Sequence, residues 1–298
     1  MKNNMKKLLF IVFIILGRLI MAQENLTVLK KNIQNEFNKT DGRFALVFWE
    51  LEPNGEHIFI NEKENFHAAS TMKTAVMIEV FRQAEEGKFN LNDSLLIKNE
   101  FKSIVDSSIY SLNLSDDSGE DLYHFIGKKK TILDLVYDMI TVSSNLATNI
   151  LIDLVNPKNI MATMKKLGAN DIQVMRGVED LKAFDLGINN TTTAYDLMIL
   201  FNKIFMSEVA SKESCDEMIK ILLNQKLNSI IPALLPTDIK VAHKTGSING
   251  VVHDSGIVFL PNDKKYILVI LSKNLKSNDQ GVETEAKVSK LIYNYVMQ

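Results

Sequence analysis

A serine and a lysine spaced three residues apart are the first candidates for chemistry. They form the motif Ser70-Thr71-Met72-Lys73 at the predicted start of a helix. Residues three apart on a helix share a face, so we expect the Lys73 amine beside the Ser70 hydroxyl. A serine hydroxyl is a poor nucleophile until a base takes its proton, and a helix N-terminus offers N–H groups to a developing oxyanion. The pair could support acyl transfer, although the motif alone could also be a surface serine that caps a helix.

A second motif, Lys244-Thr245-Gly246-Ser247, lies on a predicted strand near the C-terminus. The glycine lets a ligand approach the backbone closely, and the lysine and hydroxyls could hold a substrate carboxylate. The simpler alternative is an edge strand that a lysine protects from pairing.

A third motif, Ser143-Ser144-Asn145, stands between two predicted helices. By itself it could be an ordinary helix cap, because serine and asparagine favour such positions.

The three motifs occur in the order S-x-x-K, S-x-N and K-T-G, and in this order the chain resembles the class A β-lactamases and penicillin-binding proteins. The resemblance covers most of the chain, with its strongest segments at residues 67–73, 139–151, 190–194 and 243–256. It implies an α+β fold and a serine hydrolase that opens the β-lactam amide through an acyl-Ser70 intermediate. It also implies that no metal or organic cofactor takes part.

The resemblance assigns a role to each matching position. It makes Ser70 the nucleophile, Lys73 a partner in base catalysis, Ser143 the proton relay to the leaving nitrogen, Asn145 a ligand of the substrate amide, and Lys244, Thr245 and Ser247 the carboxylate-binding strand. The backbone N–H groups of Ser70 and Ser247 would form the oxyanion hole.

Two segments depart from the family pattern. Ser144 stands where the family usually has an aspartate. In the loop whose glutamate activates the hydrolytic water, Glu179 is one place too close to Leu181, and Lys182 replaces an asparagine. We predict that a change of loop register brings Glu179 to the site as the deacylation base. The alternative is a solvated loop carboxylate, because a water-activating base must lie within hydrogen-bond reach.

No arginine follows Arg176, so an arginine clamp from the C-terminal strands is missing. We therefore expect Lys244, Thr245 and Ser247 to hold the substrate carboxylate, with His253 as a further candidate. A related penicillin-binding D,D-peptidase or esterase that deacylates β-lactams slowly is the alternative function. A non-catalytic penicillin-binding sensor is a third.

The N-terminus has the composition of a signal peptide. Basic residues precede a short apolar run, and Ala22 offers a small residue at the predicted cleavage point. Residues 1–22 are thus predicted to be removed, leaving residues 23–298 as the catalytic domain, periplasmic or secreted and without a stable membrane partner. Removal takes away four basic residues and no acidic one, so the net charge falls from −2 to −6. That charge argues against a nucleic-acid partner.

Cysteine and histidine usage narrows the chemistry further. Cys215 is the only cysteine, which excludes an intrachain disulfide, and it is expected to be a packing residue. The five histidines are scattered and show no ligand spacing, so we predict no metal. We expect a monomer that acts on a small β-lactam molecule.

These side chains must be positioned by an α+β fold. Apolar spacing predicts helices over residues 26–37, 70–87, 131–140, 145–155, 157–167, 193–206, 211–225 and 282–297. Apolar runs at residues 44–49 and 58–60 predict a hairpin, and residues 240–246, 251–260 and 266–272 predict three later strands. Residues 103–124 are expected to form a long surface excursion. Strands from both ends should join one antiparallel sheet, with the helical middle as a second lobe.

Overall fold

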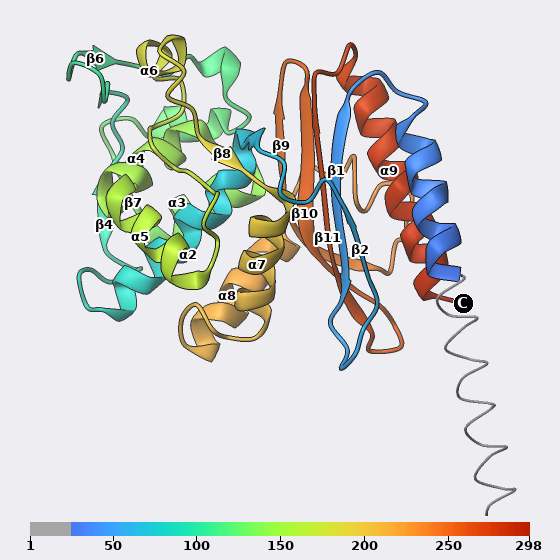
Figure 1. The fold of residues 1–298 in the computed structure, drawn as a ribbon. Helices are drawn as coiled ribbons and strands as arrows, with labels where there is room; N and C mark the ends of the chain where they lie inside the picture. Colours follow the sequence, from blue (N-terminus) through green and yellow to red (C-terminus); the bar gives the residue numbers. More distant parts are fainter. Residues whose placement is uncertain (1–24) are drawn as a thin grey trace, which may run out of the picture.

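The computed structural model describes residues 25–298, so the predicted signal peptide lies outside the described residues. The centre of the fold is a five-stranded antiparallel sheet with the order β2-β1-β11-β10-β9 (Figure 1). Its strands are β1 (Arg43–Glu50), β2 (His57–Ile60), β9 (Lys240–Ile248), β10 (Val251–Phe259) and β11 (Lys265–Lys273). The sheet predicted from both ends of the sequence is therefore confirmed.

Two helical layers cover the two faces of this sheet. The helix through residues 25–37 and α9 (Asn278–Val296) cover one face, and the helical lobe lies on the other (Figure 1). The lobe contains α2 (Lys73–Glu85), α3 (Ile132–Thr141), α4 (Asn145–Val155), α5 (Pro157–Leu167), α6 (Leu181–Asp185), α7 (Ala194–Phe205) and α8 (Lys212–Leu223). Among residues 25–298, no helix combines the length and apolar character needed to span a bilayer.

Alternating side chains along the strands divide the apolar interior into two cores. In β11, Ile267, Val269 and Leu271 face the core on the lobe side, whereas Leu268 and Ile270 face the core under α9. This alternation follows from the two-residue period of a strand. Because both faces of the sheet are covered, β11 reads as a continuous apolar run.

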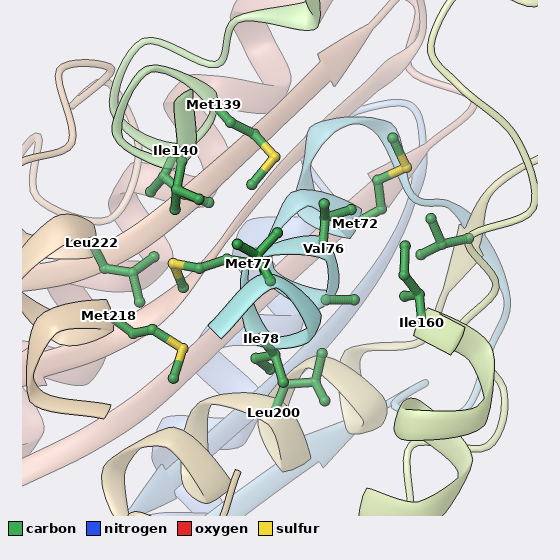
Figure 2. Close-up of a cluster of buried hydrophobic side chains, with 14 of the residues drawn as sticks. Met72, Val76, Met77, Ile78, Met139, Ile140, Ile160, Leu200, Met218 and Leu222 are labelled. Carbon is green, nitrogen blue, oxygen red and sulfur yellow. The ribbon is translucent and has the colours of Figure 1, made fainter. Parts of the chain in front are cut away.

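Helix α2 is buried on nearly every side and anchors the lobe core. Figure 2 shows Met72, just before this helix, and Val76, Met77 and Ile78 within it, packed among side chains of the surrounding helices. The buried positions of α2 include the polar side chains Lys73, Thr74, Glu79 and Gln83 as well as the apolar ones. The Ser70–Lys73 motif therefore leads into a central, buried helix.

Most predicted helix ends agree with the structure, and the caps explain them. The side chain of Thr131 accepts a hydrogen bond from the backbone N–H of Asp134 at the start of α3, as the sequence predicts. The last helix begins four residues earlier than predicted, because Ser277 caps it through the backbone N–H of Gln280. The helix expected from Ser70 begins as a 3₁₀ turn, η1 (Ala69–Met72), and continues as α2.

The segment at residues 103–124 is more ordered than a surface excursion. It follows β5 (Phe101–Lys102) and contains β6 (Ile109–Tyr110) and the 3₁₀ turns η2 (Leu114–Asp116) and η3 (Glu120–Phe125). Two other short pairings, β3 (Phe66–His67) with β8 (Thr191–Thr192) and β4 (Ser94–Leu96) with β7 (Lys129–Thr131), tie loops to the lobe. The side chains of Leu112, Asp117 and Leu122 are buried, which corrects the expectation that this segment only covers the surface.

Candidate active site

The backbone around Ser70 is held in a strained turn against β9. Ala69 has a φ of +44°, and its N–H donates to Nδ1 of His67 over 3.0 Å. A Cβ atom built on Gly246 would lie 3.0 Å from the backbone nitrogen of Ser70. A larger residue would be tightly crowded at this position, so the K-T-G strand lies directly against the predicted nucleophile. Ser70 itself lines a cavity of about 570 Å³.

Lys73 is fully buried and holds the Ser143–Asn145 turn. Its ammonium donates to the backbone oxygen of Ser143 over 2.7 Å, to Oγ of Ser143 over 3.2 Å, and to Oδ1 of Asn145 over 2.9 Å. Burial lowers the pKa of Lys73 to about 7, although the nearby charges of Asp117 and Glu179 act in the opposite direction. A lysine with a pKa near 7 exists in part as the free amine at neutral pH, and the free amine is the form that can accept a proton.

Ser143 is the point where the three motifs meet. Its backbone adopts a φ of +60°, and its Oγ also accepts a hydrogen bond from Nζ of Lys244 over 3.1 Å. Lys244 is fully buried and also donates to the backbone oxygen of Thr245 over 2.8 Å. Burial and the like charge of Lys73 lower the pKa of Lys244. One hydroxyl therefore lies between two lysines from different motifs.

The other predicted residues of the K-T-G strand differ in accessibility. Thr245 is buried, whereas Ser247 lines the cavity. Asn278, which sequence reasoning missed, donates from Nδ2 to Oγ of Ser247 over 3.3 Å and to the backbone oxygen of Ile248 over 2.8 Å. Its position at the start of α9 places it far from every motif in the sequence, so no local pattern marks it.

The structure overturns the suggestion that His253 helps to bind the carboxylate. The ring is fully buried, with Nε2 2.8 Å from the backbone oxygen of His67. The backbone N–H of Ser272 donates to Nδ1 over 3.2 Å. Burial lowers the pKa of His253 to about 4, so the ring is neutral. His253 therefore supports the β3 segment before Ser70 and cannot offer a cation to the cavity.

Glu179 reaches the cavity through a local change of backbone conformation. Asn149 on α4 fixes Val178, the residue before Glu179, from both sides. The Asn149 side chain accepts from the N–H of Val178 over 2.6 Å and donates to the carbonyl oxygen of Val178 over 3.0 Å. Glu179 then adopts a φ of +61°, and its carboxylate accepts from Nδ2 of Asn145 over 3.2 Å and from the N–H of Asn113 over 3.4 Å. Glu179 and Ser70 line the same cavity.

The environment of Glu179 suits a proton acceptor. Burial raises its pKa, and the neighbouring charges of Asp116 and Asp117 act in the same direction. A raised pKa makes a carboxylate a stronger proton acceptor than an ordinary surface glutamate. The structure thus places Glu179 at the site in the displaced register that the sequence left open.

Arg176 and Asn190 hold the loop that carries Glu179. Arg176 donates from Nε to the backbone oxygen of Ile188 over 2.8 Å. Oδ1 of Asn190 accepts from the N–H groups of Met175 and Arg176 over 2.8 and 3.1 Å. The backbone oxygen of Asn190 in turn accepts from the N–H of Ala68 over 2.9 Å, next to the Ser70 turn. This loop is therefore fixed to the same backbone that carries Ser70.

A buried carboxylate that sequence reasoning missed, Asp117, also belongs to this region. It accepts hydrogen bonds from the backbone N–H groups of Asn145 and Leu146 over 2.9 and 2.8 Å. In the sequence it lies in a stretch rich in serine, aspartate and glycine, which predicts an exposed loop, and nothing there marks it as a partner of the third motif.

No group of three or more histidine, cysteine, aspartate or glutamate side chains in residues 25–298 is arranged to hold a metal ion. Cys215 is buried on α8, as predicted for a packing residue, and burial raises the pKa of its thiol.

Comparison with known proteins agrees with this geometry. A family model described as the β-lactamase enzyme family matches residues 28–296. β-Lactamase CARB-3 of Pseudomonas aeruginosa is 25% identical over 197 residues, 65% of this chain and 64% of that protein. The chain therefore matches less than two thirds of the length of this relative. β-Lactamase ROB-1 of Haemophilus influenzae is 25% identical over 266 residues, 87% of this chain and 82% of that protein.

Solved structures show the same fold. A β-lactamase from Sphaerobacter thermophilus superposes with a TM-score of 0.76 at 25% identity, covering 88% of this chain and 95% of the other. PBP-A superposes with a TM-score of 0.78 at 26% identity, covering 91% of this chain and 97% of the other. A mutant of PBP-A has been solved as an acyl-enzyme complex with penicillin G. With a family match over nearly its whole length, this chain belongs to the β-lactamase enzyme family.

Proposed function

We propose that this protein is a class A serine β-lactamase that hydrolyses the β-lactam amide through an acyl-Ser70 intermediate. The observation that carries the proposal is the hydroxyl of Ser143, which accepts hydrogen bonds from both Lys73 and Lys244. Because its oxygen is already occupied as an acceptor, the hydroxyl proton is available to a leaving group in the cavity. This arrangement suits the cleavage of an amide, whose nitrogen must be protonated as it leaves.

Acylation is assigned to Ser70, with Lys73 as its base. The free amine of Lys73 takes the Ser70 proton while Oγ bonds to the carbonyl carbon of the substrate. The backbone N–H groups of Ser70 and Ser247 stabilise the oxyanion, since the Ser70 turn lies against β9 at Gly246. The C–N bond then breaks as Ser143 gives its proton to the nitrogen and regains one from the Lys73 ammonium.

The substrate carboxylate is assigned to the K-T-G strand. Lys244 carries the charge, and the hydroxyls of Thr245 and Ser247 supply hydrogen bonds. An anion at this position would also favour the charged form of Lys244, which burial and Lys73 disfavour in the free protein. Asn145 is assigned to the amide side chain of the substrate.

Deacylation is assigned to Glu179. It would take a proton from a water molecule as the water oxygen attacks the ester carbonyl, and the ester C–O bond would then break as Glu179 returns that proton to the Ser70 oxygen. Its place beside Asn145 on the wall of the Ser70 cavity supports this role.

A specific feature favours a second candidate, a penicillin-binding D,D-peptidase or esterase that deacylates β-lactams slowly. Lys182 stands where the family has an asparagine, and its ammonium contacts Asp106 over 2.7 Å and Ser108 over 2.7 Å near the protein surface. Lys182 therefore gives Glu179 no help in holding a water molecule. A water held by fewer partners would attack the ester more slowly.

Exposure of the purified mature chain to penicillin G, followed by intact mass spectrometry and nitrocefin turnover, separates these functions. A β-lactamase gives one transient adduct and continuing turnover, whereas the second candidate gives a persistent adduct. The Ser70→Ala variant should show neither, and an adduct that persists in this variant would overturn the assignment of the nucleophile.

The remaining assignments concern where the protein acts. We propose that it acts as a periplasmic or secreted monomer after removal of residues 1–22, and that it confers β-lactam resistance. N-terminal sequencing of the secreted protein, size-exclusion chromatography and the growth of a susceptible host on ampicillin would test these three points.

A further inference from the structure

The carboxylate of Asp117 lies at the N-terminus of α4, where the third motif begins. Its side chain is only 4% exposed. Oδ1 accepts from the N–H of Asn145 over 2.9 Å, and Oδ2 accepts from the N–H of Leu146 over 2.8 Å and from the hydroxyl of Ser144 over 3.4 Å. A carboxylate that accepts from two N–H groups in the first turn of a helix is favoured by hydrogen bonding and by the helix dipole.

The segment around Asp117 is packed too closely against the third motif to be an incidental neighbour. A Cβ atom on Gly119 would lie 2.4 Å from Cβ of Ser144, so only glycine allows the approach. Asp117 accepts from the N–H of Gly119 over 2.8 Å and from the hydroxyl of Tyr123 over 3.2 Å, which fixes the carboxylate from its own side. The backbone oxygen of Asp116 accepts from Nδ2 of Asn145 over 3.3 Å.

We propose that Asp117 is a positioning residue that takes over the place of the aspartate missing at Ser144, and so holds the Ser143–Asn145 turn for acyl transfer. The carboxylate reaches this turn from a different segment, 27 residues earlier in the chain. It fixes the backbone of Asn145, whose side chain contacts both Lys73 and Glu179. The proposal rests on the function proposed above and identifies what aligns its proton-transfer groups.

The charge of Asp117 adds an electrostatic consequence. The charged groups that face Lys73 are Asp117, Glu179 and Lys244, and the two carboxylates raise the pKa of Lys73 against the effect of burial. Removing the negative charge at Asp117 should therefore lower the pKa of Lys73 further. A residue that only stabilised the fold would leave this pKa unchanged.

The first test compares Asp117→Asn with the wild type and with Asp121→Asn, which removes an exposed carboxylate from the same segment. The N–H groups of Asn145 and Leu146 donate to different oxygens of Asp117, and asparagine replaces one of these oxygens with an NH2 group, so one of the two hydrogen bonds is lost. Acylation by a fluorescent penicillin should slow about 10²-fold, the scale expected when catalytic groups are misplaced by about an ångström. The midpoint of its pH profile should move to lower pH, and Asp121→Asn should match the wild type.

A reciprocal exchange provides the second test. Asp117→Ser should acylate slowly, and Asp117→Ser combined with Ser144→Asp should recover at least about tenfold, because the carboxylate returns to the turn from the other segment. An exchange variant no faster than Asp117→Ser would overturn the proposal. So would an Asp117→Asn variant that loses thermal stability but keeps the wild-type acylation rate and pH midpoint. If Asp117→Asn does not fold, the acylation rate of the exchange variant, compared with that of Asp117→Ser, tests the proposal instead.

A fluorophosphonate probe, which reacts with an activated serine without requiring a β-lactam, separates this proposal from the proposed function. If the wild type reacts with the fluorophosphonate but not with penicillin, the β-lactam function fails and the same variants are compared by their fluorophosphonate rates. If the wild type reacts with both probes and the Asp117 variants match it, only the role of Asp117 fails. If the wild type reacts with neither, both proposals are overturned.

Discussion

The protonation of Lys73 should set the pH dependence of acylation. Burial lowers the pKa of this lysine to about 7, and the proposed chemistry requires the free amine. With that pKa, about half of the protein carries the free amine at pH 7, but only about 1% carries it at pH 5. The acylation rate should therefore fall about 50-fold from pH 7 to pH 5, and rise no more than about twofold above pH 7. The acylation rate falls at low pH because protonation of Lys73 removes the free amine that accepts the Ser70 proton.

Stopped-flow measurement of the nitrocefin burst gives this rate directly. The Glu179→Gln variant provides a sharper version, because the acyl-enzyme should accumulate and the titration of Glu179 itself is removed. The charge of Glu179 raises the pKa of Lys73, so the midpoint in this variant should lie below that of the wild type. Circular dichroism at pH 5 shows whether the protein remains folded.

Two results would refute this reasoning. A burst rate that stays constant between pH 5 and pH 8 in both proteins would show that Lys73 is not the base for acylation. A midpoint that moves to higher pH in Glu179→Gln would show that the carboxylate does not act on Lys73 in the way its position implies.

Three further predictions address other parts of the molecule. Glu179→Gln should keep the acylation burst while steady nitrocefin turnover falls by about 10²–10⁴-fold, and equal turnover would move the protein toward the slowly deacylating class. Lys244→Ala should lower kcat/KM for penicillins by about 10- to 100-fold with a native circular dichroism spectrum, because a charge-assisted hydrogen bond to the substrate carboxylate is lost; unchanged kinetics would contradict the anchoring role. Glu285 is fully buried on α9, and burial raises its pKa well above the usual range, so its contribution to stability is lost as the pH rises above about 4.5. Glu285→Gln should therefore be more stable than the wild type by about 1–3 kcal/mol at pH 8 and little different at pH 4 in urea titrations, and the reverse order would contradict the burial of a neutral acid.

The sequence alone determined the features that depend on neighbouring residues. The three-residue spacing of Ser70 and Lys73 specifies a shared helix face whatever surrounds it. The capping side chain of Thr131 and the apolar runs of the strands likewise express local backbone preferences. The assembly of both chain ends into one sheet could also be predicted from the sequence, because strands with two apolar faces must be covered on both sides.

Only the tertiary structure decided which distant groups meet. The reach of Glu179 depends on Asn149, thirty residues earlier, which fixes Val178 and allows the positive φ that follows. The role of Asp117 depends on a segment whose composition predicts an exposed loop, and the loss of His253 as a ligand depends on its complete burial. Such contacts join residues that are far apart in the chain, and their free energy comes from packing and desolvation that no local pattern records. The motifs therefore name the proposed acylating groups, while the fold decides how they are aligned and whether the proposed base can reach an acyl-enzyme.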